Sequence, residues 1–98
     1  MIFDFTARAK REMLRILRWW ETEADHKNVF AQELIEAEEH LLTMPESGTG
    51  WKERRGKLIR KWFLPKSKVW MYYRCEADKD LIMLMAVWDC RRGTEPKL

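Results

Sequence analysis

The sequence predicts an α+β fold in which an αα-hairpin packs on one face of a small antiparallel sheet, in the order β-α-α-β-β-β. Two segments within residues 7–43 repeat apolar residues every three or four positions, which is the spacing of amphipathic helices. Short runs of alternating or continuous apolar residues precede and follow these segments, as in strands. The 98 residues are expected to form a single domain, residues 1–98.

The first elements are a strand and a helix. The segment "IFDF" (residues 2–5) alternates and favours a strand, and Thr6 is suited to cap a helix after it. That helix is expected over residues 7–23, with Glu12 among the polar residues between the apolar positions. Trp19–Trp20 is expected to be divided between the core and helix–helix packing.

A second helix is expected over residues 29–43, and the short connection makes the two helices an αα-hairpin. Pro45 disfavours a helical residue before it and so ends the helix. The apolar stripe consists of Phe30, Leu34, Ala37 and Leu41. The other side is expected to be solvated, and it carries Glu33, Glu36, Glu38 and Glu39.

The C-terminal half is expected to form a loop followed by three strands. Residues 45–57 contain three glycines and a run of charges, and are expected to be a loop. The strands are expected at 58–64, 68–75 and 81–88. The last is apolar on both faces, which predicts a central strand covered on both sides. In the middle strand one face is expected to carry Lys68, Trp70, Tyr72 and Arg74.

Two cysteines are expected to be reduced thiols. If the last hairpin turns at Asp78–Lys79, Cys75 lies opposite Ile82, and Cys90 lies roughly opposite Ser67 at the far end. This register separates the two cysteines by ~26 Å, whereas a disulfide needs Cα atoms within ~7 Å. Neither cysteine has the spacing or the nearby histidine of a zinc site, so no metal and no cofactor are expected.

The charge is unevenly distributed along the chain. Residues 1–50 hold six Lys/Arg and ten Asp/Glu, a net of −4, and residues 51–98 hold thirteen Lys/Arg and six Asp/Glu, a net of +7. Such a division indicates that the second half meets an anionic partner, either nucleic acid or an acidic protein. The alternative is a solvated surface whose charge is merely uneven.

The composition argues against membrane and secreted classes of protein. Hydrophobic residues make up 46% of the chain and charged residues 36%, as in globular proteins. The longest apolar run, residues 81–88, is far shorter than the ~20 residues of a membrane-spanning helix. The N-terminus shows no basic stretch followed by an apolar one, so no secretory signal is expected and a cytoplasmic protein is.

Four segments occur in a recognisable order and spacing. They are "FTARAKREM…RWW" in the first helix, "NVFAQELIEAEEHLLTMPESG" in the second, "VWMYYRCEADKDLIMLMAVW" in the hairpin and "RRG" after it. Together they resemble the RelE/ParE superfamily of toxins from bacterial type II toxin–antitoxin modules, and are most similar to the ParE-like branch. The resemblance covers nearly the whole chain.

This resemblance implies a fold and a function. The implied function is a growth-inhibiting, plasmid-stabilising toxin that binds DNA gyrase and is neutralised by a cognate antitoxin, with a higher-order toxin–antitoxin complex left open. The alternative is a ribosome-dependent mRNA endoribonuclease of RelE type, which needs no metal. A weaker alternative is an inactive member that only binds its antitoxin. Whether the chain is an enzyme is left open, with binding preferred.

The resemblance also implies where the toxicity residues lie. The candidates for toxicity or target binding are Arg91, Arg92, Trp88, Lys68 and Arg74. A basic patch is expected nearby, made by Arg54, Arg55, Lys57, Arg60 and Lys61. An acidic or amphipathic antitoxin segment is expected to cover this basic sheet face. For Arg91 and Arg92 the simple alternative is a surface ion pair with Asp89, which contributes under ~1 kcal/mol.

Metal-free RNA cleavage needs an acid and a base beside the phosphate, and the sequence offers few. No Tyr or His follows Arg92, and both histidines, His26 and His40, fall in the helical half. Of Tyr72 and Tyr73, one is expected in the core and the other is open to exposure. Lysine and arginine have pKa values at ~10 or above and are poor bases at neutral pH. Trp62, Trp70 and Trp88 are expected to be divided between the core and a groove that anchors the antitoxin.

Overall fold

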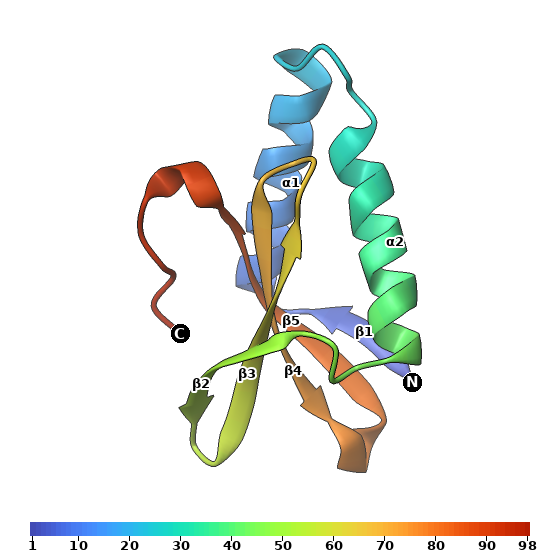
Figure 1. The fold of residues 1–98 in the computed structure, drawn as a ribbon, viewed down its shortest axis with the longest axis vertical. Coiled ribbons are helices and arrows are strands. Elements are labelled where there is room, and N and C mark those ends of the chain that lie inside the picture. Colours follow the sequence, from blue (N-terminus) through green and yellow to red (C-terminus); the bar gives the residue numbers. More distant parts are fainter.

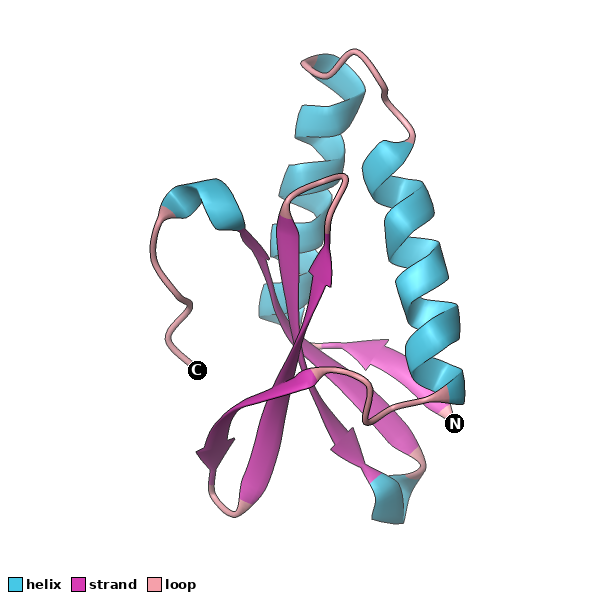
Figure 2. Cartoon of the chain, viewed as in Figure 1, coloured by secondary structure: helices cyan, strands magenta, loops and turns pink.

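The computed structural model describes residues 1–98 and places two helices on one face of a twisted five-stranded sheet (Figure 1, Figure 2). The helices are α1 (Ala7–Thr22) and α2 (Val29–Thr43). The strands are β1 (Ile2–Phe5), β2 (Thr49–Arg54), β3 (Lys57–Leu64), β4 (Val69–Glu76) and β5 (Leu81–Asp89). Two short 3-10 helices are η1 (Ala77–Lys79) and η2 (Cys90–Arg92).

The strand order in the sheet is β1-β5-β4-β3-β2. Strands β2 to β5 form an antiparallel meander, and β1 lies parallel to β5 at the edge. β5 buries Ile82, Leu84 and Val87 under the helices and Ala86 and Trp88 on the other face of the sheet, which explains why its sequence is apolar on both faces. The predicted α+β class and the αα-hairpin on one face of the sheet are confirmed.

The prediction of a loop over residues 45–57 is wrong for its second part, because residues 49–54 form β2. This strand lies at the sheet edge and is exposed along nearly all its length, so it shows no apolar alternation. Backbone pairing with β3 holds it in place. The turn between the two strands is Arg55–Gly56, with φ of 52° and 76°. Positive φ at both central residues is typical of a tight hairpin turn.

The start of α1 is as predicted, but Glu12 is not on its polar side. Thr6 Oγ1 accepts a hydrogen bond from Ala9 N at 3.0 Å and caps the helix. Glu12 is only 8% exposed, and its Oε1 accepts from Val87 N at 3.1 Å. The reason is that β1 pairs with β5 no further than Phe5, opposite Leu84. The edge of β5 beyond that point has no strand beside it, and the Glu12 carboxylate supplies an acceptor there.

The expectation that all four glutamates of α2 are solvated is also wrong, because Glu33 is 7% exposed. Its carboxylate crosses to the β3–β4 turn and accepts from Lys66 N at 2.8 Å and from Ser67 N at 2.7 Å. The Ser67 hydroxyl donates to it as well. Helix periodicity assigns Glu33 to a face, but it cannot show that a turn from another element needs an acceptor there.

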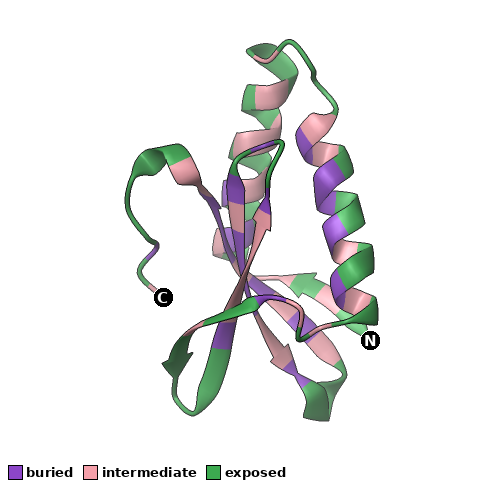
Figure 3. Cartoon of the chain, in the orientation of Figure 1, coloured by how far each residue is buried: buried purple, intermediate pink, exposed green.

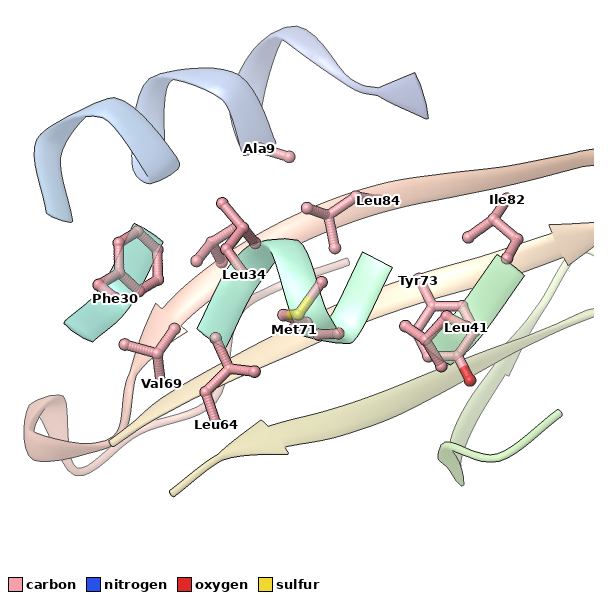
Figure 4. Close-up of a cluster of buried hydrophobic side chains, with 12 residues drawn as sticks. Ala9, Phe30, Leu34, Leu41, Leu64, Val69, Met71, Tyr73, Ile82 and Leu84 are labelled. Carbon is pink, nitrogen blue, oxygen red and sulfur yellow. The ribbon is translucent and has the colours of Figure 1, made fainter. Parts of the chain in front are cut away.

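The main core lies between the helices and the sheet, as Figure 3 and Figure 4 show. Phe30, Leu34 and Leu41 of α2 pack there against apolar side chains of β3, β4 and β5. A smaller cluster lies on the other side of the sheet, which we call the open face. It consists of Ile59, Tyr72, Ala86 and Trp88, with Trp51, Trp70 and Leu98 packed around it.

The last hairpin has the predicted register near its turn. Cys75 lies opposite Ile82, and both cysteines are free thiols. An irregularity in the pairing at Tyr72/Tyr73 then moves the register by one residue. Cys90 N therefore donates to Lys68 O at 2.9 Å, one position from the predicted neighbour Ser67. Neither helix has the length and apolar character needed to span a membrane.

Candidate functional site

The candidate site lies where the chain leaves β5. Arg91 and Arg92 are the last residues of η2, and both are exposed. Arg91 donates from Nε to Asp89 Oδ1 at 2.9 Å and from NH2 to Asp89 Oδ2 at 2.7 Å. The hydrogen bonds with Asp89 raise the pKa of Arg91. For Asp89 burial opposes ionisation, but the hydrogen bonds from the Arg91 side chain and backbone lower the pKa of its carboxyl.

The two arginines do not act as a pair, because their side chains point to different elements. The Arg91 guanidinium lies over the Trp19 ring of α1, with its carbon 4.8 Å from the ring centroid. The Arg92 guanidinium lies over the Trp88 ring at 3.7 Å. Arg91 is matched by Asp89, whereas Arg92 takes part in no ion pair. We call Arg91 and Arg92 the arginine rim. Its free positive charge therefore belongs to Arg92.

A small hollow opens between α1 and the end of β5, beside these arginines. Its volume is about 220 Å³. Its walls include Arg15, Ile16 and Trp19 of α1, and Val87, Arg91 and Arg92. Sequence reasoning did not single out Arg15 as a site residue, and it assigned Trp19 to packing, although Trp19 is 41% exposed. The available signal was the spacing of four between Arg15 and Trp19, which places both on one helix face.

Trp88 packs beneath Arg92 and is itself buried. Its side chain is 8% exposed, and its indole Nε1 donates to Thr94 O at 2.7 Å. The C-terminal tail (residues 93–98) turns back beside the sheet (Figure 1) and covers this cluster with Leu98. Arg8 NH1 donates to Lys97 O at 2.7 Å, and Trp51 Nε1 donates to Glu95. Trp88 therefore contacts Arg92 and the tail and offers little surface of its own to a partner.

The other two toxicity candidates lie at opposite ends of β4. Lys68 is exposed in the β3–β4 turn with a φ of 61°, and its carbonyl oxygen bonds Cys90 N beside the rim. Arg74 lies near the far end of the strand, opposite Ile59. The five predicted candidates thus do not form one continuous surface.

Arg74 lines a second hollow, on the open face, which is strongly basic. Its volume is about 400 Å³, and it is lined by Arg54, Arg55, Lys57, Ile59, Arg74 and Met85. Buried Glu76 forms ion pairs with Lys57 and, at 3.8 Å, with Arg74 NH2. The hydrogen bond from Lys57 is the main cause of a lowered pKa for Glu76. The cations outnumber this carboxylate, so the hollow suits an anion.

The remaining two residues of the predicted basic patch lie elsewhere. Arg60 points to the helix side of the sheet, where NH1 donates to Glu46 O at 3.2 Å and to Gly48 O at 2.9 Å. It therefore fastens the loop between α2 and β2. Lys61 lies over the Trp70 ring, with Nζ 4.5 Å from the centroid. Only Arg54, Arg55 and Lys57 of the predicted patch share one hollow.

Both tyrosines are buried, so the expectation that one is open to exposure is wrong. Tyr73 faces the main core, where its hydroxyl donates to Pro45 O at 2.8 Å and accepts from Gly48 N at 2.9 Å. Tyr72 faces the open side but is 2% exposed, and Trp51 packs on it at 4.7 Å between ring centroids. Burial raises the pKa of both phenols. Neither phenol is placed to exchange a proton with a substrate at the rim.

The fold is similar to that of two solved structures, one from a toxin–antitoxin system and one of an isolated toxin. A chain of the chromosomal ParDE TA system from P. aeruginosa superposes with a TM-score of 0.65 and 18% identity, over 91% of this chain and 95% of that one. The isolated E. coli RelE toxin superposes with a TM-score of 0.61 and 19% identity, over 98% of this chain and 86% of that one. No protein-family model and no curated protein matches the sequence. The chain therefore has the RelE/ParE-like fold.

Proposed function

We propose that this chain is the toxin of a type II toxin–antitoxin module, acting in the bacterial cytoplasm and held inactive by a cognate antitoxin. The likeness to structures of a ParDE system and of RelE over nearly the whole chain supports this. The observation that carries the proposal furthest is the exposed arginine rim after β5, where Arg92 presents a charge with no carboxylate partner. An exposed and uncompensated arginine is suited to binding another macromolecule.

The preferred mode of action is inhibition of DNA gyrase by binding, which would also give plasmid stabilisation. Burial of Tyr72 and Tyr73 supports binding over cutting, because neither phenol reaches the surface with its proton. The basic hollow with Arg54, Arg55, Lys57 and Arg74 favours the second candidate, a ribosome-dependent endoribonuclease, since its size and charge suit an RNA phosphate.

Induction of the chain in a bacterial host tests the proposal. Filamentation with a DNA-damage response, together with inhibition of purified gyrase, supports the preferred mode. Loss of translation with cleaved mRNA supports the nuclease. Normal growth despite verified soluble protein contradicts a toxin and leaves a member that only binds its antitoxin.

A variant with Arg91→Ala and Arg92→Ala tests the rim itself. Both side chains lie outside the core, so the fold should survive and growth inhibition should disappear. The matched control is Arg18→Ala, an exposed α1 residue that does not line the hollow. Growth arrest by the double variant, at equal expression, would show that the rim is not the toxic site.

A further inference from the structure

We propose that the hollow between α1 and the end of β5 binds an acidic protein segment that inserts one bulky apolar side chain. The proposal rests on the proposed function in one respect, since it names the kind of antitoxin segment that would cover Arg92. It differs from the expectation that the antitoxin covers the basic patch of the open face, because this hollow lies against α1.

The size and lining of the hollow fit one large apolar side chain. Ile16, Trp19 and Val87 form its apolar wall, and its volume is about 220 Å³. An apolar cavity of roughly 150 Å³ is large enough to hold benzene. A leucine or phenylalanine side chain therefore fits, and its burial against this wall would stabilise a complex.

The charges around the hollow specify an acidic partner. Arg15 and Arg92 line it, and both are exposed and form no ion pair.

The two acidic side chains at the hollow are already engaged. Glu12 bonds Val87 N and lies 3.5 Å from Arg8 Nε, while both carboxylate oxygens of Asp89 accept from Arg91. The uncompensated charge is therefore positive. Carboxylates on either side of the apolar anchor would complete the pairing.

The rings at the site favour a protein over a single-stranded nucleic acid. Nucleic-acid bases bind such surfaces by stacking on free aromatic faces. Here the guanidinium of Arg91 lies over Trp19, and that of Arg92 lies over Trp88. A base would have to displace an arginine from its ring, whereas a peptide carboxylate can bind Arg92 where it lies.

Display selection with the purified, full-length chain tests the proposal without knowing the antitoxin. A library of random 12-residue peptides is selected against the immobilised protein, together with oligo(dT) and oligo(U) in parallel binding assays. We expect enrichment of peptides that combine several Asp or Glu with one Leu, Phe or Met. When such a peptide is added, the amide and indole resonances of the protein should shift most at Trp19, Val87 and Arg92 in a two-dimensional NMR spectrum.

A charge-neutralised variant and a matched control sharpen the test. The variant Arg15→Gln with Arg92→Gln should bind the selected peptides at least tenfold more weakly, with an unchanged circular dichroism spectrum. The control Arg55→Gln lies in the β2–β3 turn, outside this hollow, and should bind them as the parent does.

Three results would overturn the proposal: no enrichment, enrichment of peptides without acidic residues, or resonance shifts centred on another surface. Tighter binding of an oligonucleotide at Trp19 and Arg92 would also overturn it and would indicate a nucleic-acid site. The measurement uses purified protein and no cells, so peptide binding can succeed while the growth test fails, and the reverse. The two proposals are thus refuted separately.

Discussion

Removal of the Glu33 carboxylate is expected to destabilise the whole β3–β4 turn. The carboxylate is buried and accepts hydrogen bonds from Lys66 N, Ser67 N and the Ser67 hydroxyl. Ser67 is itself 1% exposed, so in Glu33→Ala its two donors are left without an acceptor and with little access to water. A buried donor that loses its partner costs about 1–3 kcal/mol. Two such groups lead us to expect a loss of about 3 kcal/mol in the free energy of unfolding.

Urea unfolding followed by tryptophan fluorescence measures this loss. With a slope of about 1–3 kcal/mol/M, the transition midpoint should fall by roughly 1–3 M. The matched control is Glu39→Ala, an exposed glutamate of the same helix, which should stay within about 0.5 kcal/mol of the parent. Glu33→Gln should fall between the two, because its amide keeps one acceptor oxygen but places a donor against other donors. If Glu33→Ala is no less stable than Glu39→Ala, the carboxylate does not hold the turn.

Four further outcomes follow from the contacts described. Tyr73→Phe removes an acceptor from a buried backbone amide and should lower the free energy of unfolding by about 1–3 kcal/mol, measured by the same urea titration. Trp88→Phe removes the indole bond to the tail, so carboxypeptidase should trim residues 94–98 faster than in the parent. The lowered pKa of Asp89 means that its stabilising effect is present above the unfolded value of ~3.9 and is lost as the pH falls through the folded value. The stability difference between the parent and Asp89→Asn should therefore shrink as unfolding is measured from pH 5 down to pH 2. In growth assays Arg92→Ala should lose more inhibition than Arg91→Ala, since only Arg92 has an unmatched charge; the opposite order would contradict this division.

The sequence predicted the elements whose pattern is set by burial. Helix and strand periods follow from which side faces the core, so the bounds of β1 and α2 agree with the structure. The bounds of α1, β3 and β5 differ by one residue at one end, and those of β4 by one residue at both ends. Strand β2 was missed because an exposed edge strand has no buried side to impose a pattern. Its remaining signal was the turn, Arg55–Gly56, which is weaker than the Asn-Gly or Asp-Gly pairs usual in such hairpins.

The site could be predicted only as a location. Sequence order correctly places Arg91 and Arg92 just after the last strand. It does not show where their side chains point, and in the structure the Arg91 guanidinium lies over Trp19 and that of Arg92 over Trp88. The buried roles of Glu12 and Glu33 depend on backbone groups of distant segments that lack a partner. Which backbone groups lack a partner depends on the tertiary arrangement, so no local sequence pattern can predict these hydrogen bonds.

One physical cause connects the two buried glutamates with the candidate site. Each binds backbone donors at the end of the sheet from which the rim emerges, Glu12 at Val87 and Glu33 in the turn that leads to Lys68. Lys68 in turn accepts the backbone bond from Cys90, the first residue of η2. Polar contacts from both helices thus hold the backbone segments that lead to the arginine rim. This explains how an exposed, irregular end of the chain can present Arg91 and Arg92 in two defined directions.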